Sequence, residues 1–178
     1  MYEHEIKFEV KKLDNLLKIL DEQKVEFYKE KHQVDKVWIL KDADGTKLES
    51  GKPVVRTREE NDKVMLTLKI ELEHGTFEEH ETEIENLAAA EGMLGALGLR
   101  KLVTIDKHRK MAKLNEFTLC IDSVKDLGDF LEIEFVSETK DDDAKQKIIT
   151  LASTFGINES DIVKNTYNTL LCRKFDLK

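Results

Sequence analysis

Apolar and polar residues alternate with a period of two along much of this chain, the pattern of strands with one buried face. The segments that follow it are 2–10, 32–40, 54–59, 63–72, 78–85, 102–112, 116–124 and 129–137. Short polar turns such as residues 60–63 separate several of them, which predicts hairpin connections. We therefore expect about eight strands in an antiparallel sheet.

Four further segments predict helices, over residues 13–24, 86–99, 141–156 and 159–175. In the first, leucines at positions 13, 16, 17 and 20 recur at helical spacing. Asn86 is a candidate N-cap of the second helix, and Gly98 and Gly156 are candidate C-terminal stops. Strands joined mainly by hairpins, with four helices, indicate an α+β fold built on a curved sheet or barrel.

Length and composition narrow the class of protein. The 178 residues contain no linker or repeat, so we expect one domain over residues 1–178, with two small halves as the alternative. Charged residues make up 37%, above the usual quarter, and the net charge of −8 argues against nucleic-acid or anionic-membrane partners. We expect no membrane-spanning segment and no secretory signal, because the apolar runs are short and no basic segment precedes them.

The two cysteines, Cys120 and Cys172, lie far apart and form no Cys-x-x-Cys or Cys/His motif. This spacing argues against a zinc site and favours a reducing, cytoplasmic location. A disulfide between them is the minor alternative.

Most of the predicted strands carry charged residues on one face and apolar residues on the other. The acids of the charged faces are Glu3, Glu5, Glu81, Glu83, Asp122, Glu132 and Glu134, and the bases are Lys7, Arg56, Arg58, Lys69, Lys107 and Arg109. On a flat sheet such a face is ordinary solvated surface. In a closed barrel it would line a wet lumen, because a dry interior cannot hold so many ions.

The chemistry of the charged set favours a phosphate ligand with a metal. Arginine and lysine bind phosphate oxygens, and arginine can do so with two parallel hydrogen bonds. Carboxylates two positions apart on a strand share a face, and oxygen ligands are what Mg²⁺ and Mn²⁺ prefer. From alternation alone the solvated face and the lumen both stay open, since segment 102–112 is polar on both faces.

In their order along the chain, these residues resemble the CYTH family, the triphosphate tunnel metalloenzymes. The opening Glu3-x-Glu5-x-Lys7 matches the family's hallmark motif, and the closing segment 166–171, TYNTLL, is similar to its C-terminal element. Between them stand Gln33, Asp35, Arg56, Arg58, Lys69, Glu81, Glu83, Lys107, Arg109, Asp122, Gly128, Glu132 and Glu134. The resemblance spans nearly the whole chain.

The resemblance implies an eight-stranded antiparallel β-barrel with flanking helices, which binds a triphosphate group with Mg²⁺ or Mn²⁺. The implied metal ligands are Glu3, Glu5, Glu132 and Glu134, and the implied phosphate-binding residues are Lys7, Arg56, Arg58, Lys69, Lys107 and Arg109. Of these, Glu5, Lys7, Lys69 and Arg109 are the expected catalytic residues. Gln33, Asp35, Glu81, Glu83 and Asp122 are expected to line the tunnel. In one departure, family members often carry an arginine at the start of the strand that bears Glu81 and Glu83, whereas segment 77–83 has only His80 nearby.

Three activities are compatible with this set. The resemblance is greatest to class IV adenylyl cyclases, which convert ATP to cyclic AMP and pyrophosphate, and it also implies a homodimer. The alternatives are hydrolysis of inorganic, thiamine or nucleoside triphosphate, and binding of polyphosphate without turnover. The expected partner is ATP or another triphosphate compound, with no nucleic acid and no membrane.

Overall fold

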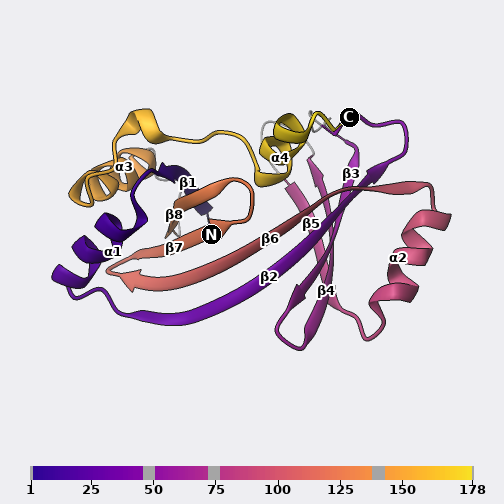
Figure 1. The fold of residues 1–178 in the computed structure, drawn as a ribbon, viewed down its shortest axis with the longest axis horizontal. Coiled ribbons are helices and arrows are strands. Elements are labelled where there is room, and N and C mark those ends of the chain that lie inside the picture. Colours follow the sequence, from indigo (N-terminus) through magenta and orange to yellow (C-terminus); the bar gives the residue numbers. More distant parts are fainter. Residues whose placement is uncertain (1, 46–50, 72–76, 138–142, 178) are drawn as a thin grey trace. The chain divides into compact units, whose positions relative to one another are not determined.

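The computed structural model describes residues 2–45, 51–71, 77–137 and 143–177 (Figure 1). Within these ranges lie eight strands: β1 Tyr2–Val10, β2 Phe27–Leu40, β3 Pro53–Glu60, β4 Lys63–Glu71, β5 Phe77–Glu83, β6 Leu99–Leu114, β7 Phe117–Val124 and β8 Gly128–Ser137. The helices of the same ranges are α1 Leu13–Glu22, α2 Leu87–Ala96, α3 Ala144–Thr154 and α4 Tyr167–Phe175, with a 3₁₀ turn, η1, at Glu159–Asp161.

The strands form one sheet in the order β1-β8-β7-β6-β2-β3-β4-β5. The pairs β1–β8, β7–β8, β2–β3, β3–β4 and β4–β5 are antiparallel. The predicted eight-stranded antiparallel sheet with helices is therefore confirmed. The order begins at β1 and ends at β5 in the described residues, so closure into a barrel stays a prediction.

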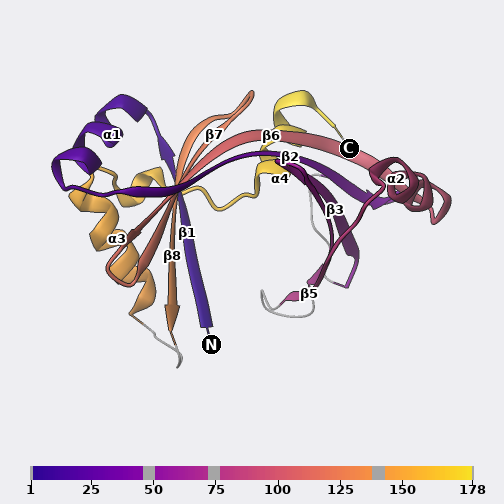
Figure 2. The same cartoon turned by 90° about the horizontal axis from the view of Figure 1, so that it is seen from below.

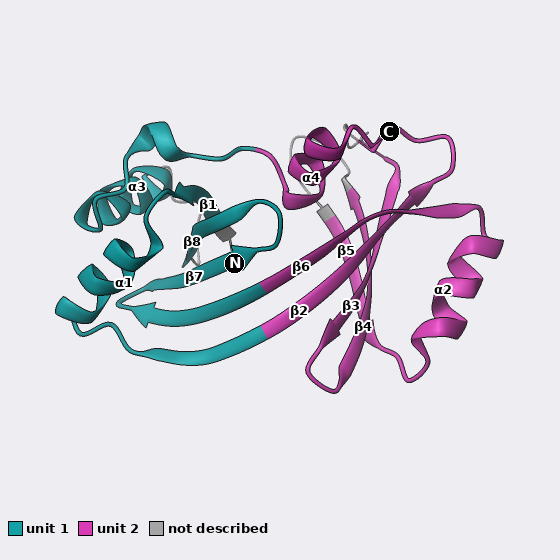
Figure 3. Cartoon of the chain, in the orientation of Figure 1, with its two compact units in different colours: residues 1–31, 108–164 teal, residues 32–107, 165–178 magenta. Residues whose placement is uncertain are grey.

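The chain divides into two compact units (Figure 3). Unit 1 comprises residues 1–31 and 108–164, and unit 2 comprises residues 32–107 and 165–178. The long strand β6 contributes residues to both units. The expectation of a single domain over residues 1–178 stays a prediction.

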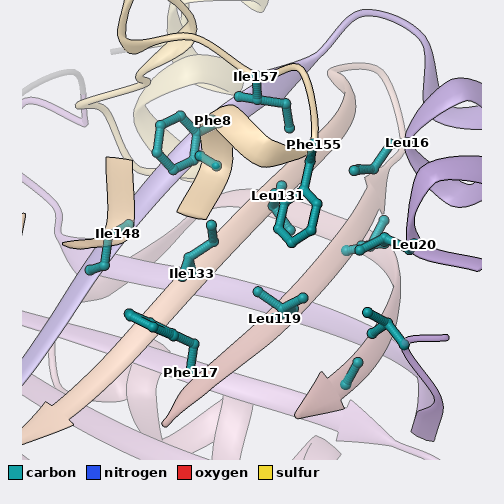
Figure 4. Close-up of a cluster of buried hydrophobic side chains, with 14 of the residues drawn as sticks. Phe8, Leu16, Leu20, Phe117, Leu119, Leu131, Ile133, Ile148, Phe155 and Ile157 are labelled. Carbon is teal, nitrogen blue, oxygen red and sulfur yellow. The ribbon is translucent and has the colours of Figure 1, made fainter. Parts of the chain in front are cut away.

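The core of unit 1 lies between helices α1 and α3 and one face of β1, β7 and β8 (Figures 2 and 4). Phe8, Leu131 and Ile133 come from the sheet and are fully buried, as are Leu20 of α1 and Ile148 of α3. Burial of such side chains stabilises the unit by ~2 kcal/mol each. Because alternate strand residues face opposite ways, this packing directs Glu5, Lys7, Glu132 and Glu134 to the other face.

Unit 2 buries a smaller cluster between α2 and the sheet. Leu94 of α2 packs with Trp38, Val55 and Leu99, and Leu66 and Leu68 of β4 pack against this group. The same alternation therefore places Arg56, Arg58 and Lys69 on the face away from α2.

The predicted helix over residues 159–175 is wrong in its first half. A single 3₁₀ turn occupies Glu159–Asp161, and α4 begins at Tyr167. Between them Ile162 forms an antiparallel bridge with Phe8, and Val163 donates its amide hydrogen to the Lys7 carbonyl at 2.8 Å. Pairing with β1 thus holds this segment extended despite its helical pattern.

The predicted N-cap of α2 and the predicted glycines after α2 and α3 are confirmed. Asn86 Oδ1 accepts a hydrogen bond from the Ala89 amide at 2.9 Å. Gly98 and Gly156 adopt φ values of 89° and 76°, the left-handed region that ends helices. Within the described part of the chain the longest helix has 11 residues, well short of the ~20 that a membrane-spanning helix needs.

Candidate functional site

The charged face of β1 and β8 carries the most informative part of the candidate site. Glu5 lies directly opposite Glu134 in the antiparallel ladder, and Lys7 lies directly opposite Glu132. Directly paired residues share a face, so the two successive pairs place four charged side chains side by side on one face of the sheet. Lys7 Nζ is 3.4 Å from Glu132 Oε1, whereas Glu5 and Glu134 carry the same sign.

This arrangement changes the acidity of Glu5. Although Glu5 is an exposed residue of β1, the atoms packed around its carboxylate remove part of its hydration. This loss, and next the negative charge of Glu132, raise the pKa from 4.5 to about 7. Lys7 acts in the opposite direction, and Glu134 adds to the increase. Like charges directly opposite each other destabilise a sheet, so the Glu5–Glu134 pair is a place where a cation would be stabilising.

Arg109 of β6 joins the same cluster. Its Nε and Nη2 donate to the two carboxylate oxygens of Asp122, each at 2.6 Å, and Nη2 also contacts Glu132. Burial opposes the charged form, but the hydrogen bonds and charge of Asp122 dominate and raise the pKa of Arg109 above its ordinary value. The guanidinium is therefore always charged and is held in a fixed orientation. We call Glu5, Lys7, Arg109, Asp122, Glu132 and Glu134 the unit 1 cluster.

Cys120 also belongs to this face, and the sequence analysis missed it. Its thiol lies 3.7 Å from Glu134 Oε1, and Cys120 pairs directly with Glu132 in the β7–β8 ladder. Burial, opposed by Arg109, raises the pKa of the thiol to about 12. Its position two residues before Asp122 was the signal that could have placed it here. Both cysteines are buried free thiols, so the minor alternative of a disulfide is not observed.

The donor set of the unit 1 cluster fits a hard divalent cation. The described residues contain no group of three or more His, Cys, Asp and Glu already arranged around a metal position. Glu132 contacts Lys7 and Arg109, and its negative charge raises the pKa of Glu5 more than that of Glu134 does. Glu5 and Glu134 are the directly opposed carboxylates at which a cation would relieve this repulsion. Glu3 is placed in β1 opposite Val136, and its side chain lies outside the described part of the structure.

Unit 2 contains a second, mainly basic cluster on β2 to β5. Arg58 donates through Nε and Nη2 to the two oxygens of Asp35 at 2.6 and 2.7 Å. The two residues are direct partners in the β2–β3 ladder, and Asp35 is buried. Asp35 thus fixes Arg58 in the way that Asp122 fixes Arg109 in unit 1.

Arg56, the neighbour of Arg58 on the same face of β3, is less well satisfied. Its Nη2 donates to Thr67 Oγ1 at 3.3 Å and lies 3.6 Å from Glu81. Its Nε is buried and has no hydrogen-bond partner among the described residues. Burial, followed by the charge of Arg58, lowers the pKa of Arg56. Two adjacent guanidinium groups and an unpaired N–H are features that a bound anion would stabilise.

The remaining predicted residues of unit 2 lie on strands β2, β4, β5 and β6. Gln33 is buried and donates to Glu60 at 2.6 Å, and Lys69 forms an ion pair with Glu79 at 3.2 Å. Glu83 pairs with Lys63, at the exposed end of β5. Lys107 is buried, with its Nζ 5.1 Å from the centre of the Tyr167 ring. We call Gln33, Asp35, Arg56, Arg58, Thr67, Lys69 and Glu81 the unit 2 cluster.

The alternation of charged and apolar residues along the strands identified most of these residues, but it did not identify the residues that they contact. Thr67, which accepts from Arg56 and donates to Glu81 Oε2 at 2.9 Å, was not among the predicted site residues. His80, which stands near the position of the family's arginine, pairs with Leu68 on the other face of the sheet, and its Nε2 lies 2.7 Å from Glu78 Oε1. It therefore cannot replace an arginine in the unit 2 cluster.

Comparison with known proteins identifies the family of the chain. The CYTH domain family matches residues 1–167, and the chain belongs to that family. A Methanocaldococcus jannaschii protein named "Putative adenylate cyclase" is 26% identical over 172 residues, which cover 94% of this chain and 97% of that protein.

Solved structures share the fold over almost the whole chain. A conserved hypothetical protein of Pyrococcus furiosus is 31% identical with a TM-score of 0.77, covering 95% of this chain and 99% of the other. A Hippeastrum protein described as having a dominant triphosphatase activity has a TM-score of 0.68 at 18% identity, covering 98% of this chain and 96% of that one. The second likeness shows a common fold.

Proposed function

We propose that this protein is a divalent-metal-dependent adenylyl cyclase that converts ATP to cyclic AMP and pyrophosphate. The observation that carries the proposal is the direct opposition of Glu5 and Glu134, flanked by Lys7 and Arg109. This row offers oxygen ligands to a cation and positive charge to phosphate on one face. The full-length similarity to the Methanocaldococcus jannaschii protein supports cyclisation as the particular reaction.

The reaction requires the ribose 3′-oxygen to attack the α-phosphorus while the bond to the pyrophosphate oxygen breaks. Lys7 and Arg109 would neutralise the negative charge that develops on the phosphate oxygens. Asp122 and Glu132 keep Arg109 oriented, so little reorganisation is needed. When bound at Glu5 and Glu134, Mg²⁺ or Mn²⁺ would supply Lewis-acid stabilisation of the same oxygens.

The 3′-hydroxyl must lose its proton during the attack. Glu5 is the carboxylate of the unit 1 cluster whose pKa, about 7, lies near neutrality. A base with a pKa close to the working pH is ionised often enough to accept a proton and basic enough to hold it. Because a cation bound at Glu5 would lower this pKa again, we assign proton acceptance to the carboxylate face of the unit 1 cluster and not to Glu5 alone.

We assign binding of an anion, such as a phosphate group, to the unit 2 cluster taken by itself. The buried Nε of Arg56 and the adjacent charge of Arg58 are both stabilised by an anion. Asp35 holds Arg58 in a fixed orientation, and Lys69 and Lys107 supply further charge. A triphosphate has enough oxygens to satisfy several of these donors together.

Hydrolysis of a triphosphate is the second candidate. The same charged groups would stabilise attack of water on the terminal phosphorus, because only the position of the nucleophile differs. The triphosphatase activity described for the Hippeastrum protein belongs to a chain of the same fold and makes this alternative concrete. Polyphosphate binding without turnover is the third outcome.

Product analysis distinguishes these reactions. The purified protein is incubated with ATP, and separately with inorganic triphosphate, in Mg²⁺ and then in Mn²⁺, and the products are resolved by anion-exchange chromatography. Cyclic AMP with equimolar pyrophosphate from ATP is the expected result. Orthophosphate without cyclic AMP would contradict the cyclase and establish the triphosphatase. Glu134→Gln should abolish turnover, whereas Glu9→Gln, an exposed change on the neighbouring strand β1, should retain it.

A further inference from the structure

Gln33 of β2 is a buried residue whose side-chain amide has one unsatisfied atom. The residue is 1% exposed, and its Nε2 donates to Glu60 Oε2 at 2.6 Å. A carboxylate only accepts hydrogen bonds, so the amide nitrogen must face Glu60, and the amide cannot be turned over. The amide oxygen, Oε1, is buried and receives no hydrogen bond from the residues that the structure describes. Buried polar atoms normally have a partner, so this acceptor needs a donor.

Gln33 stands beside the paired arginines of the unit 2 cluster. In the β2–β3 ladder Gln33 lies opposite Glu60, and Asp35 lies opposite Arg58. Arg56 is two residues from Arg58 on the same face of β3. Residues two apart on a strand are separated by about 7 Å, so Gln33 is one such step from the Arg58–Asp35 pair and two steps from the level of Arg56.

The arginines of the cluster have the opposite hydrogen-bonding polarity. Arg56 and Arg58 are donors, and the buried Nε of Arg56 has no acceptor among the described residues. A phosphate oxygen supplies an acceptor for this N–H, but an ionised phosphate has no hydrogen to give to Gln33 Oε1. One ligand satisfies both atoms only if it carries an O–H or N–H group a short distance from its phosphate. The hydroxyl and amino groups of a nucleoside triphosphate meet this requirement, whereas inorganic triphosphate has no fixed donor of this kind.

We propose that Gln33 is a specificity-determining residue, whose Oε1 accepts a hydrogen bond from a hydroxyl or amino group of the nucleoside part of the ligand. The inference rests on the proposed binding of a phosphate group to the same cluster. A site with a buried acceptor discriminates against ligands that lack the donor, because the acceptor then stays unpaired. Gln33 thereby favours ATP over triphosphates without such a group.

Glu60 is the side chain whose rotation we expect to open the way to the Gln33 amide. It is the last residue of β3 and is only half-buried. The turn residues that follow it, Asn61 and Asp62, are exposed. Access at this end of the strand requires movement of a side chain and leaves the strand pairing in place.

Isothermal titration in EDTA, where metal-dependent turnover stops, tests the role of Gln33 with two ligands. Gln33→Met keeps an unbranched side chain of similar size and removes the acceptor. The ratio of ATP affinity to inorganic triphosphate affinity should fall about threefold to tenfold, the effect of one lost hydrogen bond. Release of Glu60 changes the charge near both ligands, so this ratio is the proper readout. Glu59→Gln, an exposed change on the other face of β3, should keep the wild-type ratio.

Nucleotide analogues identify the donor in the wild-type protein, without any substitution that could disturb folding. The probes 2′-deoxy-ATP, 3′-deoxy-ATP and purine riboside triphosphate each lack one hydroxyl or amino group of ATP. One of them should bind about threefold to tenfold more weakly than ATP. The same loss should be absent in Gln33→Met, because the acceptor is already gone.

Failure of this inference and failure of the proposed function give different results. A wild-type protein that binds neither ATP nor inorganic triphosphate would overturn phosphate binding by the unit 2 cluster, and the role of Gln33 with it. If the wild type binds both ligands, two results overturn the role of Gln33 alone. One is that all three analogues bind as tightly as ATP, and the other is that Gln33→Met keeps the wild-type ratio.

Discussion

Glu5 lies directly opposite Glu134 in the β1–β8 ladder, so two carboxylates stand next to each other on neighbouring strands. Their neighbours along the same row, Lys7 and Glu132, form an ion pair. Loss of hydration and next the charge of Glu132 raise the pKa of Glu5, and the opposed carboxylate of Glu134 adds to the increase. The pair is understandable as a cation site.

The first prediction concerns the pH dependence of stability. The pKa of Glu5 is about 7 in the folded protein and 4.5 ordinarily, so the folded state binds the proton more tightly. The resulting stabilisation is full below pH 4.5 and is lost as the pH rises through about 7. Glu5→Gln removes the titrating carboxylate, and with it this loss of stability at high pH. In thermal denaturation without metal it should therefore exceed the wild type at alkaline pH and match it in acid.

The control for this experiment is Glu9→Gln, an exposed residue of the same strand. Its melting temperature should follow that of the wild type at every pH. A Glu5→Gln curve parallel to the wild-type curve would show that Glu5 titrates normally in the folded protein.

The second prediction concerns Asp122, which is fully buried and holds Arg109 through two hydrogen bonds. Asp122→Asn removes the charge and leaves the guanidinium only partly compensated. Removing one partner of a buried ion pair costs about 3 kcal/mol or more in the free energy of unfolding. Urea denaturation measures this value. Asp62→Asn, an exposed change in the β3–β4 turn, is the control, and equal midpoints for the two variants would contradict the prediction.

The third prediction concerns substrate affinity. Arg56→Gln removes one of two adjacent guanidinium groups, and a hydrogen bond to a charged group contributes about 2 kcal/mol. Isothermal titration with a non-hydrolysable ATP analogue should therefore show at least a tenfold weaker dissociation constant. Lys63→Gln, which disturbs only the exposed pair with Glu83, should bind as the wild type does. Unchanged affinity of Arg56→Gln would remove the unit 2 cluster from the phosphate site.

The fourth prediction concerns Cys120. Burial raises the pKa of its thiol to about 12, so the reactive thiolate is scarce at neutral pH. Iodoacetamide should leave Cys120 unmodified in the folded protein and alkylate it after denaturation, as peptide mass spectrometry would show. Rapid alkylation of the folded protein near neutrality would mean that the thiol is accessible and ionised.

Strand alternation made the charged faces predictable. The apolar residues next to Glu5 and Glu132 in the sequence, Ile6 and Ile133, pack into the core, so the charged residues face the other way. Alternation could not give the register that sets Glu5 against Glu134, since the register depends on how two distant strands meet. Asp35 and Asp122 were predicted to line the site. Their ion pairs with Arg58 and Arg109 also depend on the register, so these pairs were not predicted. The bridge between Ile162 and Phe8 likewise overrides a local helical pattern.

We propose that Glu5 and Glu134 together hold the divalent cation. Titration with Mn²⁺, followed by electron paramagnetic resonance, measures binding without substrate turnover. The wild type and Glu9→Gln should bind Mn²⁺ with the same affinity, whereas Glu5→Gln and Glu134→Gln should each weaken binding at least tenfold. Equal Mn²⁺ binding by all four proteins would contradict the assignment of this pair.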